Sequence, residues 1–245
     1  SIYKIPELIV LNKLLKIKGY LIADIKLEFD EKGNLKDNYL VSGLVKEAKL
    51  KTLKNEDIDK INFFFKITKK NFIFENIQLR FNDYIFNSKN ISAKKNQDYF
   101  LVSGNFENDI IDLSKKDLDL IKDNLFFDTE FSKVRFSSNN NFSFKIDKKF
   151  RLKNQKIISK IKLHEAKILN NFNLKKTFPE VQNVISLLDN QINLEYNDDI
   201  FLINGNGKVL FQKTEDLISY KYEKNKDKLI FENSLQIKKN PFHIE

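Results

Sequence analysis

Several segments of this chain alternate apolar and polar residues with a period of two. In the first such segment the apolar positions are Leu21, Ala23, Ile25, Leu27 and Phe29. The same spacing recurs at Ile61, Phe63, Phe65 and Ile67, at Ile73, Ile77, Leu79 and Phe81, at Phe142, Phe144, Ile146 and Phe150, and at Leu229, Phe231, Leu235 and Ile237. Because successive side chains of a strand point to opposite faces, this pattern is typical of antiparallel strands with one apolar and one polar face.

The remaining local signals predict turns and two or three short helices. Asp30 to Asn34, with Gly33, is a hairpin-type turn. Helices are predicted over residues 6–18, over residues 114–125 with Ser114 as the cap, and from Pro179 onward along Val181, Val184, Ile185, Leu187 and Leu188. We therefore expect a mainly β fold, namely an elongated, twisted antiparallel sheet that forms a groove and carries these helices. A β-sandwich or a half-open barrel is the alternative.

Length and composition bound the organisation of the chain. Its 245 residues are 41% hydrophobic, which is enough for a sizeable core. We expect a β-groove segment with an N-terminal helix over residues 1–178, and a helix with continuing strands over residues 179–245; one continuous domain is the alternative. Because position 1 is Ser and no stretch approaches 18 consecutive apolar residues, we expect a portion of a longer protein, with any membrane anchor outside this chain.

Few residues in this chain are suited to covalent chemistry. The lack of cysteine excludes disulfides, thiolate metal sites and cysteine nucleophiles. The two histidines, His164 and His243, are far apart in the sequence. Glu165 is the residue directly after His164, and adjacent side chains of a strand point to opposite faces, so these two do not form a ready catalytic pair. The one G-x-G, Gly205 to Gly207, lacks the third glycine of a dinucleotide site. We expect no enzyme, metal or cofactor, although carboxylates from distant strands leave a hydrolase as an open alternative.

The charge of the chain is strongly basic, with a formal net charge of +9. Only Arg80, Arg135 and Arg151 are arginines among 43 basic residues, and arginine is the usual reader of phosphates and guanine edges. The lysines are spread along the chain with acidic residues among them. A solvated polar face is therefore the favoured interpretation, attraction to anionic lipid the second, and nucleic-acid binding the least favoured.

The order of the strand motifs also carries a resemblance. Lys18 to Gly33 reads K-G-x-L-x-A-x-I-x-L-x-F-D-x-x-G, Tyr39 to Val45 reads Y-x-V-x-G-x-V, and Ile58 to Ile67 reads I-x-x-I-x-F-x-F-x-I. Over about residues 18–125 this order resembles the periplasmic region of bacterial AsmA-like proteins, a group that includes YhdP- and TamB-like proteins. The resemblance implies a long β-groove in the periplasm, an inner-membrane anchor beyond this chain, and a role in lipid transport or outer-membrane assembly. It implies no catalytic residues.

The function predicted from the sequence is therefore non-enzymatic. We expect an envelope protein segment that holds phospholipid acyl chains in an apolar groove, with the membrane surface or other envelope proteins as further candidate partners. The alternative is a structural or adhesion-type β-domain with a closed core. The residues predicted to contact lipid are Leu21, Ile25, Leu27, Phe29, Phe63, Phe65, Ile77, Leu79, Phe81, Val102, Phe142, Phe144 and Ile146.

Overall fold

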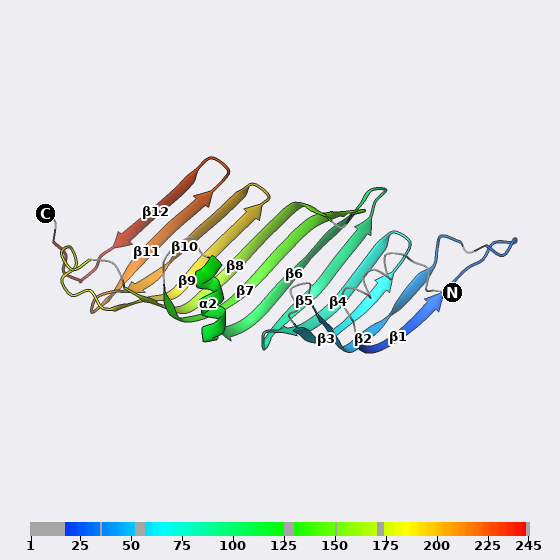
Figure 1. Cartoon of the computed structure of the whole chain (residues 1–245), viewed down its shortest axis with the longest axis horizontal. Helices are drawn as coiled ribbons and strands as arrows, with labels where there is room; N and C mark the ends of the chain where they lie inside the picture. The colour runs from blue at the N-terminus through cyan, green and yellow to red at the C-terminus, as the bar shows by residue number, and fades with distance from the viewer. Residues whose placement is uncertain are drawn as a thin grey trace. The chain divides into compact units, whose positions relative to one another are not determined.

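A computed structural model describes residues 18–34, 36–51, 57–124, 130–149, 151–170 and 174–243 (Figure 1). Within them lie twelve strands and one helix, α2 (Lys115–Asn124). The strands are β1 (Lys18–Lys26), β2 (Leu40–Lys51), β3 (Asp57–Ile67), β4 (Asn71–Phe81), β5 (Tyr84–Lys95), β6 (Tyr99–Asp112), β7 (Phe131–Asp147), β8 (Leu152–Leu169), β9 (Val184–Asn197), β10 (Ile200–Leu210), β11 (Glu215–Lys224) and β12 (Leu229–Gln236). They form one antiparallel sheet in chain order that does not close into a barrel. The mainly β prediction is confirmed, as an open sheet rather than a sandwich.

One of the three predicted helices is found. Helix α2 begins after Ser114, whose hydroxyl accepts a hydrogen bond from the Asp117 amide at 3.3 Å, as the capping pattern predicted. The predicted helix over residues 6–18 lies outside the described residues, apart from Lys18, which begins β1. The helix predicted from Pro179 is wrong, because residues 179–183 form a turn and an irregular stretch that leads into β9 at Val184.

The residues that suggested that helix lie in a strand instead. Val184 and Ile185 pair with Leu169 and Ile168 of β8, where β-branched side chains pack well. Leu187 and Leu188, the next apolar pair, point to opposite faces of β9. The two leucines therefore do not form one apolar side of a helix, as the sequence pattern suggested. A short apolar run with this spacing fits both structures, and pairing with β8 decides between them.

The predicted turn after β1 is present. The Asp30 carboxylate accepts hydrogen bonds from the amides of Lys32 and Asn34 at 2.9 and 2.8 Å, and Gly33 has a φ of +79°. Hydrogen bonds from Asn34, first from its side chain, hold the pKa of Asp30 below its ordinary value. Turn chemistry of this kind is legible in the sequence because it is local.

Register assigns the side chains of the sheet to its two faces. Residues opposite each other in an antiparallel pair point to the same face, and Leu21 pairs with Val45, which pairs with Phe63. The face that carries these three side chains is called the apolar face here, and the other is called the polar face.

Bulges shift the alternation in three neighbouring strands. Glu47 in β2, Lys60 in β3 and Asn76 in β4 have φ values of 51°, 48° and 52°, and each lies where the ladder register shifts or skips a residue. A bulge adds one residue, so the alternation changes parity on passing it. Ile73, predicted to share a face with Ile77, pairs with Lys66 and lies on the polar face, which corrects that prediction.

The contacts divide the chain into two compact units. The first consists of Ser1–Asn108 and Asn141–Gln155, and the second of Asp109–Asn140 and Lys156–Glu245. The boundary expected at residue 178 falls within the second unit and stays a prediction.

The second unit has a small closed core at one end of its apolar face. Val181, Val209 and Phe211 are buried there, and Phe178 packs edge-on against Phe211 with ring centroids 5.0 Å apart. The segment 174–183 thus covers the ends of β9 and β10. A sandwich-like covering layer exists at this place, although it is a loop and not a second sheet.

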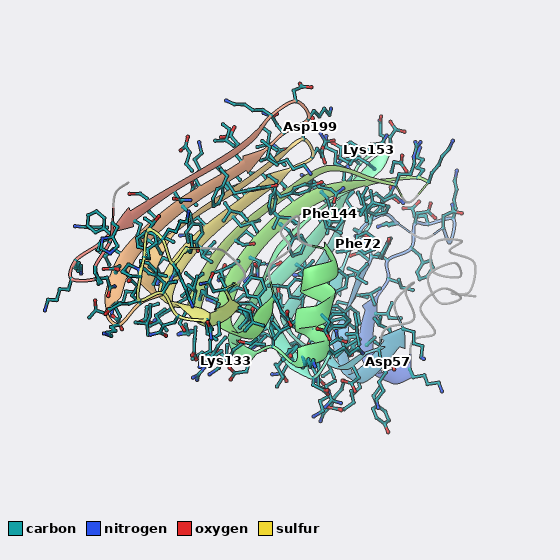
Figure 2. The ribbon with its side chains drawn as sticks, turned by 60° about the vertical axis from the view of Figure 1, so that its left-hand side comes forward. Asp57, Phe72, Lys133, Phe144, Lys153 and Asp199 are labelled. Carbon is teal, nitrogen blue, oxygen red and sulfur yellow. The ribbon has the colours of Figure 1, made fainter. Side chains whose placement is uncertain are left out.

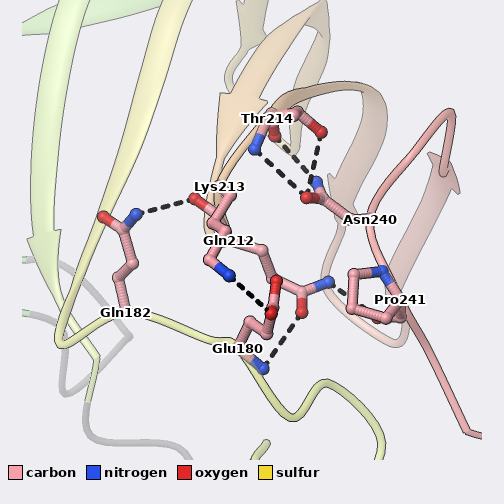
Figure 3. A network of polar contacts seen from close by, with 7 residues as sticks. All are labelled: Glu180, Gln182, Gln212, Lys213, Thr214, Asn240 and Pro241. Atoms are coloured by element: carbon pink, nitrogen blue, oxygen red, sulfur yellow. Dashed lines mark hydrogen bonds and ion pairs between the residues drawn. The ribbon is translucent and has the colours of Figure 1, made fainter.

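Buried amides hold this loop in place (Figure 3). The Gln212 side chain donates to the Pro241 carbonyl at 2.9 Å and accepts from the Glu180 amide at 3.2 Å. Its backbone carbonyl accepts a hydrogen bond from the Gln182 side chain at 2.7 Å. Because Gln212 is fully buried, these bonds satisfy polar groups that would otherwise destabilise the fold.

Candidate functional site: the apolar face of the sheet

The first unit has one face built almost wholly from apolar side chains. Paired residues and ring contacts place on it Leu21, Ala23 and Ile25 of β1; Val41, Gly43, Val45, Ala48 and Leu50 of β2; Ile58, Ile61, Phe63, Phe65 and Ile67 of β3; Phe72, Phe74, Ile77, Leu79 and Phe81 of β4; Tyr84, Phe86, Ser88, Ile91 and Ala93 of β5; Phe100, Val102, Gly104 and Phe106 of β6; and Phe142, Phe144 and Ile146 of β7. The polar face of the same strands mixes lysine, asparagine and acidic residues with scattered apolar ones, namely Ile22, Leu44, Phe64, Ile73, Ile85 and Leu101.

Phenylalanine rings contact one another along this face. The ring of Phe63 lies edge-on to that of Phe74, with centroids 5.6 Å apart, and Phe72 meets Phe100 at 5.8 Å. Phe142 stacks on both Phe106 and Phe144, at 5.7 and 5.8 Å. Phe142 and Phe144 both belong to β7, and the other three pairs join strands that are neighbours or next neighbours in the sheet, so the aromatic surface extends across β3 to β7 in the first unit.

Most of these side chains are half-buried, as a single layer of sheet would leave them. Figure 2 shows Phe72 and Phe144 on the same side of the ribbon. Four apolar side chains of this face are buried: Ala48, Ile61 and Ile77 each follow a bulge directly, and Phe65 pairs with Phe74, two residues before the bulge at Asn76. Bulges bend strands, so side chains beside the bend shield one another. Elsewhere the described part of this face retains access to solvent or to a ligand.

An asparagine that the sequence analysis did not single out holds two of the bulges together. The Asn62 amide group donates to the Lys60 carbonyl at 2.8 Å, and its oxygen accepts from the Glu47 amide at 3.0 Å. Asn190 makes comparable bonds in the second unit, next to the bulge at Asp189, to the carbonyls of Leu188 and of its cross-strand partner Lys208. One asparagine among many carries no signal in a single sequence.

The residues predicted to contact lipid lie together on the apolar face, with two exceptions. Eleven of the thirteen are on it by register or ring contact. Leu27 and Phe29 lie beyond the end of β1 and are exposed. Leu21 is 65% exposed on the edge strand, whereas Phe65 is 8% exposed and is part of the packed bend. Contact with lipid stays a prediction for all thirteen.

The second unit has a face of the same kind, with more polar groups. Ile192, Leu194 and Tyr196 of β9 pair with Gly205, Ile203 and Phe201 of β10. The Tyr220 ring lies over Gly205, and burial raises the pKa of Tyr220 to about 12. A depression of about 410 Å³ at the hairpin ends is lined by Tyr196, Phe201 and Lys224 among others, but the ion pair of Asp199 and Lys226 at 2.6 Å makes its mouth polar.

The groups suited to catalysis do not assemble into a reactive site in the described residues. Nε2 of His164 lies 3.2 Å from the Ser137 hydroxyl, but within the described chain no acidic side chain is bonded to the His164 ring. Lys133 and then Lys167 lower the pKa of Glu165, with oxygens 2.6 and 3.4 Å from their Nζ atoms. A carboxylate held ionised in this way is a poor general acid. Among the described residues, no three His, Cys, Asp or Glu side chains cluster as metal ligands.

No family model, no curated protein and no solved structure matches this chain. In the part of the chain that the structure describes, no helix is both long and apolar enough to cross a membrane.

Proposed function

We propose that this chain is a non-enzymatic segment that holds the acyl chains of phospholipids against the apolar face of its sheet. The observation that carries the proposal is the half-buried surface of phenylalanine, isoleucine and leucine side chains on the apolar face of the first unit. In the described residues of that unit the sheet is a single layer. We further propose, from the resemblance to AsmA-like proteins, that it works in the bacterial periplasm in lipid transport or outer-membrane assembly. The predicted inner-membrane anchor would belong to a segment outside this chain.

The energetics favour a hydrocarbon ligand over a polar one. Burial of a methylene group contributes about 0.8 kcal/mol, so a dozen methylenes laid along the face would contribute roughly 10 kcal/mol before the cost of ordering the chain. The rings of Phe72 and Phe100, and those of Phe142 and Phe144, offer contiguous contact area for this purpose. Few polar groups on the face would need desolvation, Ser88 being one that is already buried.

The first test is native mass spectrometry of the protein purified without strong detergent, followed by lipid extraction. We expect copurified phospholipid that dissociates at raised collision energy. A folded protein that carries no lipid and takes up no fluorescent phospholipid would contradict the proposal.

Two adjacent phenylalanines provide a matched pair of variants. Phe63 lies on the apolar face and contacts Phe74, whereas Phe64 lies on the polar face and is 52% exposed. We expect Phe63→Asp to lose at least tenfold in bound lipid because it places a charge among the acyl contacts. Phe64→Asp should bind lipid as the native sequence does. Circular dichroism of both variants separates lost binding from lost folding.

A closed-core structural domain is the second candidate, and one observation favours it. In the second unit the segment 174–183 already covers part of the apolar face through Phe178 and Val181. If the apolar face of the first unit is also covered in the functional protein, Phe63→Asp should unfold the chain while neither the variant nor the native protein binds lipid. The matched pair of variants therefore distinguishes the two candidates.

A further inference from the structure

Basic residues are concentrated at one end of the strands in the first unit. This group, called the basic rim, consists of residues 66–70, 94–98, 145–149 and 151–153, where β3 joins β4, β5 joins β6, and β7 approaches β8. It holds ten lysines and arginines and two aspartates, and the neighbouring loop between β1 and β2, at the same end, adds two lysines and four acidic residues. At the opposite end, residues 46–51, 57–60 and 80–83 hold five basic and four acidic residues. Figure 2 shows Lys153 and Asp57 at these two ends.

The parts of the basic rim are neighbours in space. The Lys95 amide donates to the Lys70 carbonyl at 2.7 Å, which joins the first two turns. Nζ of Lys148 lies 3.0 Å from the Asp98 carboxylate, which joins the second turn to the third. Ten positive charges of one surface are therefore held along three adjacent hairpin ends.

Internal ion pairs neutralise only part of this charge. Asp147 binds Arg151 and Lys153 at 2.7 and 3.4 Å, Asp98 binds Lys148, and Asp37 binds Lys69. Lys70, Lys94 and Lys149 are exposed. In the described residues no acidic side chain forms an ion pair with any of these three. They are available to an external anion. The opposite end instead pairs Lys51 with Asp57, and Arg80 with Asp59 through two hydrogen bonds.

The apolar face reaches the basic rim. Phe72 pairs with Ile67 and Ala93, and Phe100 pairs with Lys95, whose ammonium lies 5.9 Å from the centroid of that ring. Phe72 and Phe100 are in contact. Lysines and aromatic rings therefore adjoin at this edge, the combination that suits the boundary between lipid headgroups and acyl chains.

We propose that the basic rim docks the protein on an anionic phospholipid membrane, with the end of the apolar face at Phe72 and Phe100 against the headgroups. This inference rests on the proposed function. It adds the end of the sheet at which lipid enters and the negative charge of the headgroups that the protein binds. A membrane fits better than a nucleic acid because lysines act as point charges, and the adjoining rings lead into an apolar face without hydrogen-bonding groups for bases.

The test is cosedimentation with vesicles of phosphatidylcholine containing one third phosphatidylglycerol, against vesicles of phosphatidylcholine alone. The variant is K70E/K94E/K149E, which changes only exposed lysines that lack ion-pair partners in the described residues. The control is K156E/K160E/K162E, three exposed lysines on the polar face of β8. In each triple variant three lysines become glutamates, so the net charge falls by six, from +9 to +3.

We expect the native protein and the control to bind the anionic vesicles, and the rim variant to lose about a hundredfold in partition coefficient. Each lysine near an anionic surface contributes roughly a fivefold factor. Equal loss in both triple variants, or no preference of the native protein for anionic vesicles, would overturn the proposal. So would a rim variant that loses single-stranded DNA binding while its vesicle binding is unchanged. Native mass spectrometry of the rim variant reports copurified lipid separately, so failure of the docking proposal is distinguishable from failure of lipid holding.

Discussion

At the scale of single residues, Tyr220 shows how the apolar face accommodates a polar group. A Cβ atom at Gly205 would lie 2.2 Å from Cζ of Tyr220, so the absent side chain is what lets the ring lie on β10. The residue is half-buried there, and this burial raises the pKa of the Tyr220 phenol to about 12. The ordinary value is about 10, so the folded state retains a proton that the unfolded state releases.

This difference predicts a specific loss of stability at alkaline pH. Below pH 10 both states hold the proton and Tyr220 contributes its full stability; between pH 10 and 12 the unfolded state ionises first, so the free energy of unfolding falls. Tyr220→Phe should reduce the fall between pH 9 and 12 by about 2 kcal/mol at most, measured by urea titrations. Tyr20→Phe, at a residue 72% exposed, is the control and should leave the fall unchanged. Equal alkaline losses in all three proteins would contradict the assignment.

At the scale of elements, the bulges decide which residues share a face. Glu47 and Lys60 adopt a left-handed backbone that costs a non-glycine residue roughly 1 kcal/mol or more. Asn62 offsets this cost by bonding to both bulges, and the shape of β2 and β3 therefore depends on one amide.

We expect Asn62→Ala to lower the free energy of unfolding by about 1–2 kcal/mol, because the Glu47 amide and the Lys60 carbonyl lose their partner. The measurement is chemical denaturation at neutral pH. Asn193→Ala, an exposed change on the polar face of β9, is the control and should shift stability by less than about 0.5 kcal/mol. If the two substitutions have the same effect, Asn62 does not stabilise the bulges.

These same bulges mark where prediction from the sequence ends. The period of two places Phe63 with Phe65 and Ile77 with Leu79 correctly, since no bulge intervenes. It misplaces Ile73, because the left-handed residue between it and Ile77 is an asparagine inside an ordinary strand pattern. At Glu47 and Lys60 not even the residue type signals a bulge. Alternation is a local property, whereas a bulge is set by pairing with neighbouring strands.

At the scale of the whole molecule, the sequence predicts the open antiparallel sheet but not what covers its faces. The turn at Asp30 and the alternating strands define hairpins in chain order, which is the order observed. The basic rim cannot be predicted from the sequence, because its segments are far apart along the chain and become neighbours only when the hairpins align. The covering of Val209 and Phe211 by Val181 likewise depends on a loop for which the sequence predicted a helix.

An uncovered apolar face predicts that the native protein, freed of lipid, binds a neutral hydrophobic dye. Nile red carries no charge, so its binding cannot be attributed to the excess of lysine; contact with the half-buried rings of Phe72, Phe74 and Phe144 should raise its emission severalfold in buffer. Added palmitate should displace the dye, because both compete for the same surface. Moderate urea supplies the contrast: a closed core would give no emission until the protein begins to unfold, whereas an open face gives its highest emission in the native state and loses it as the sheet unfolds.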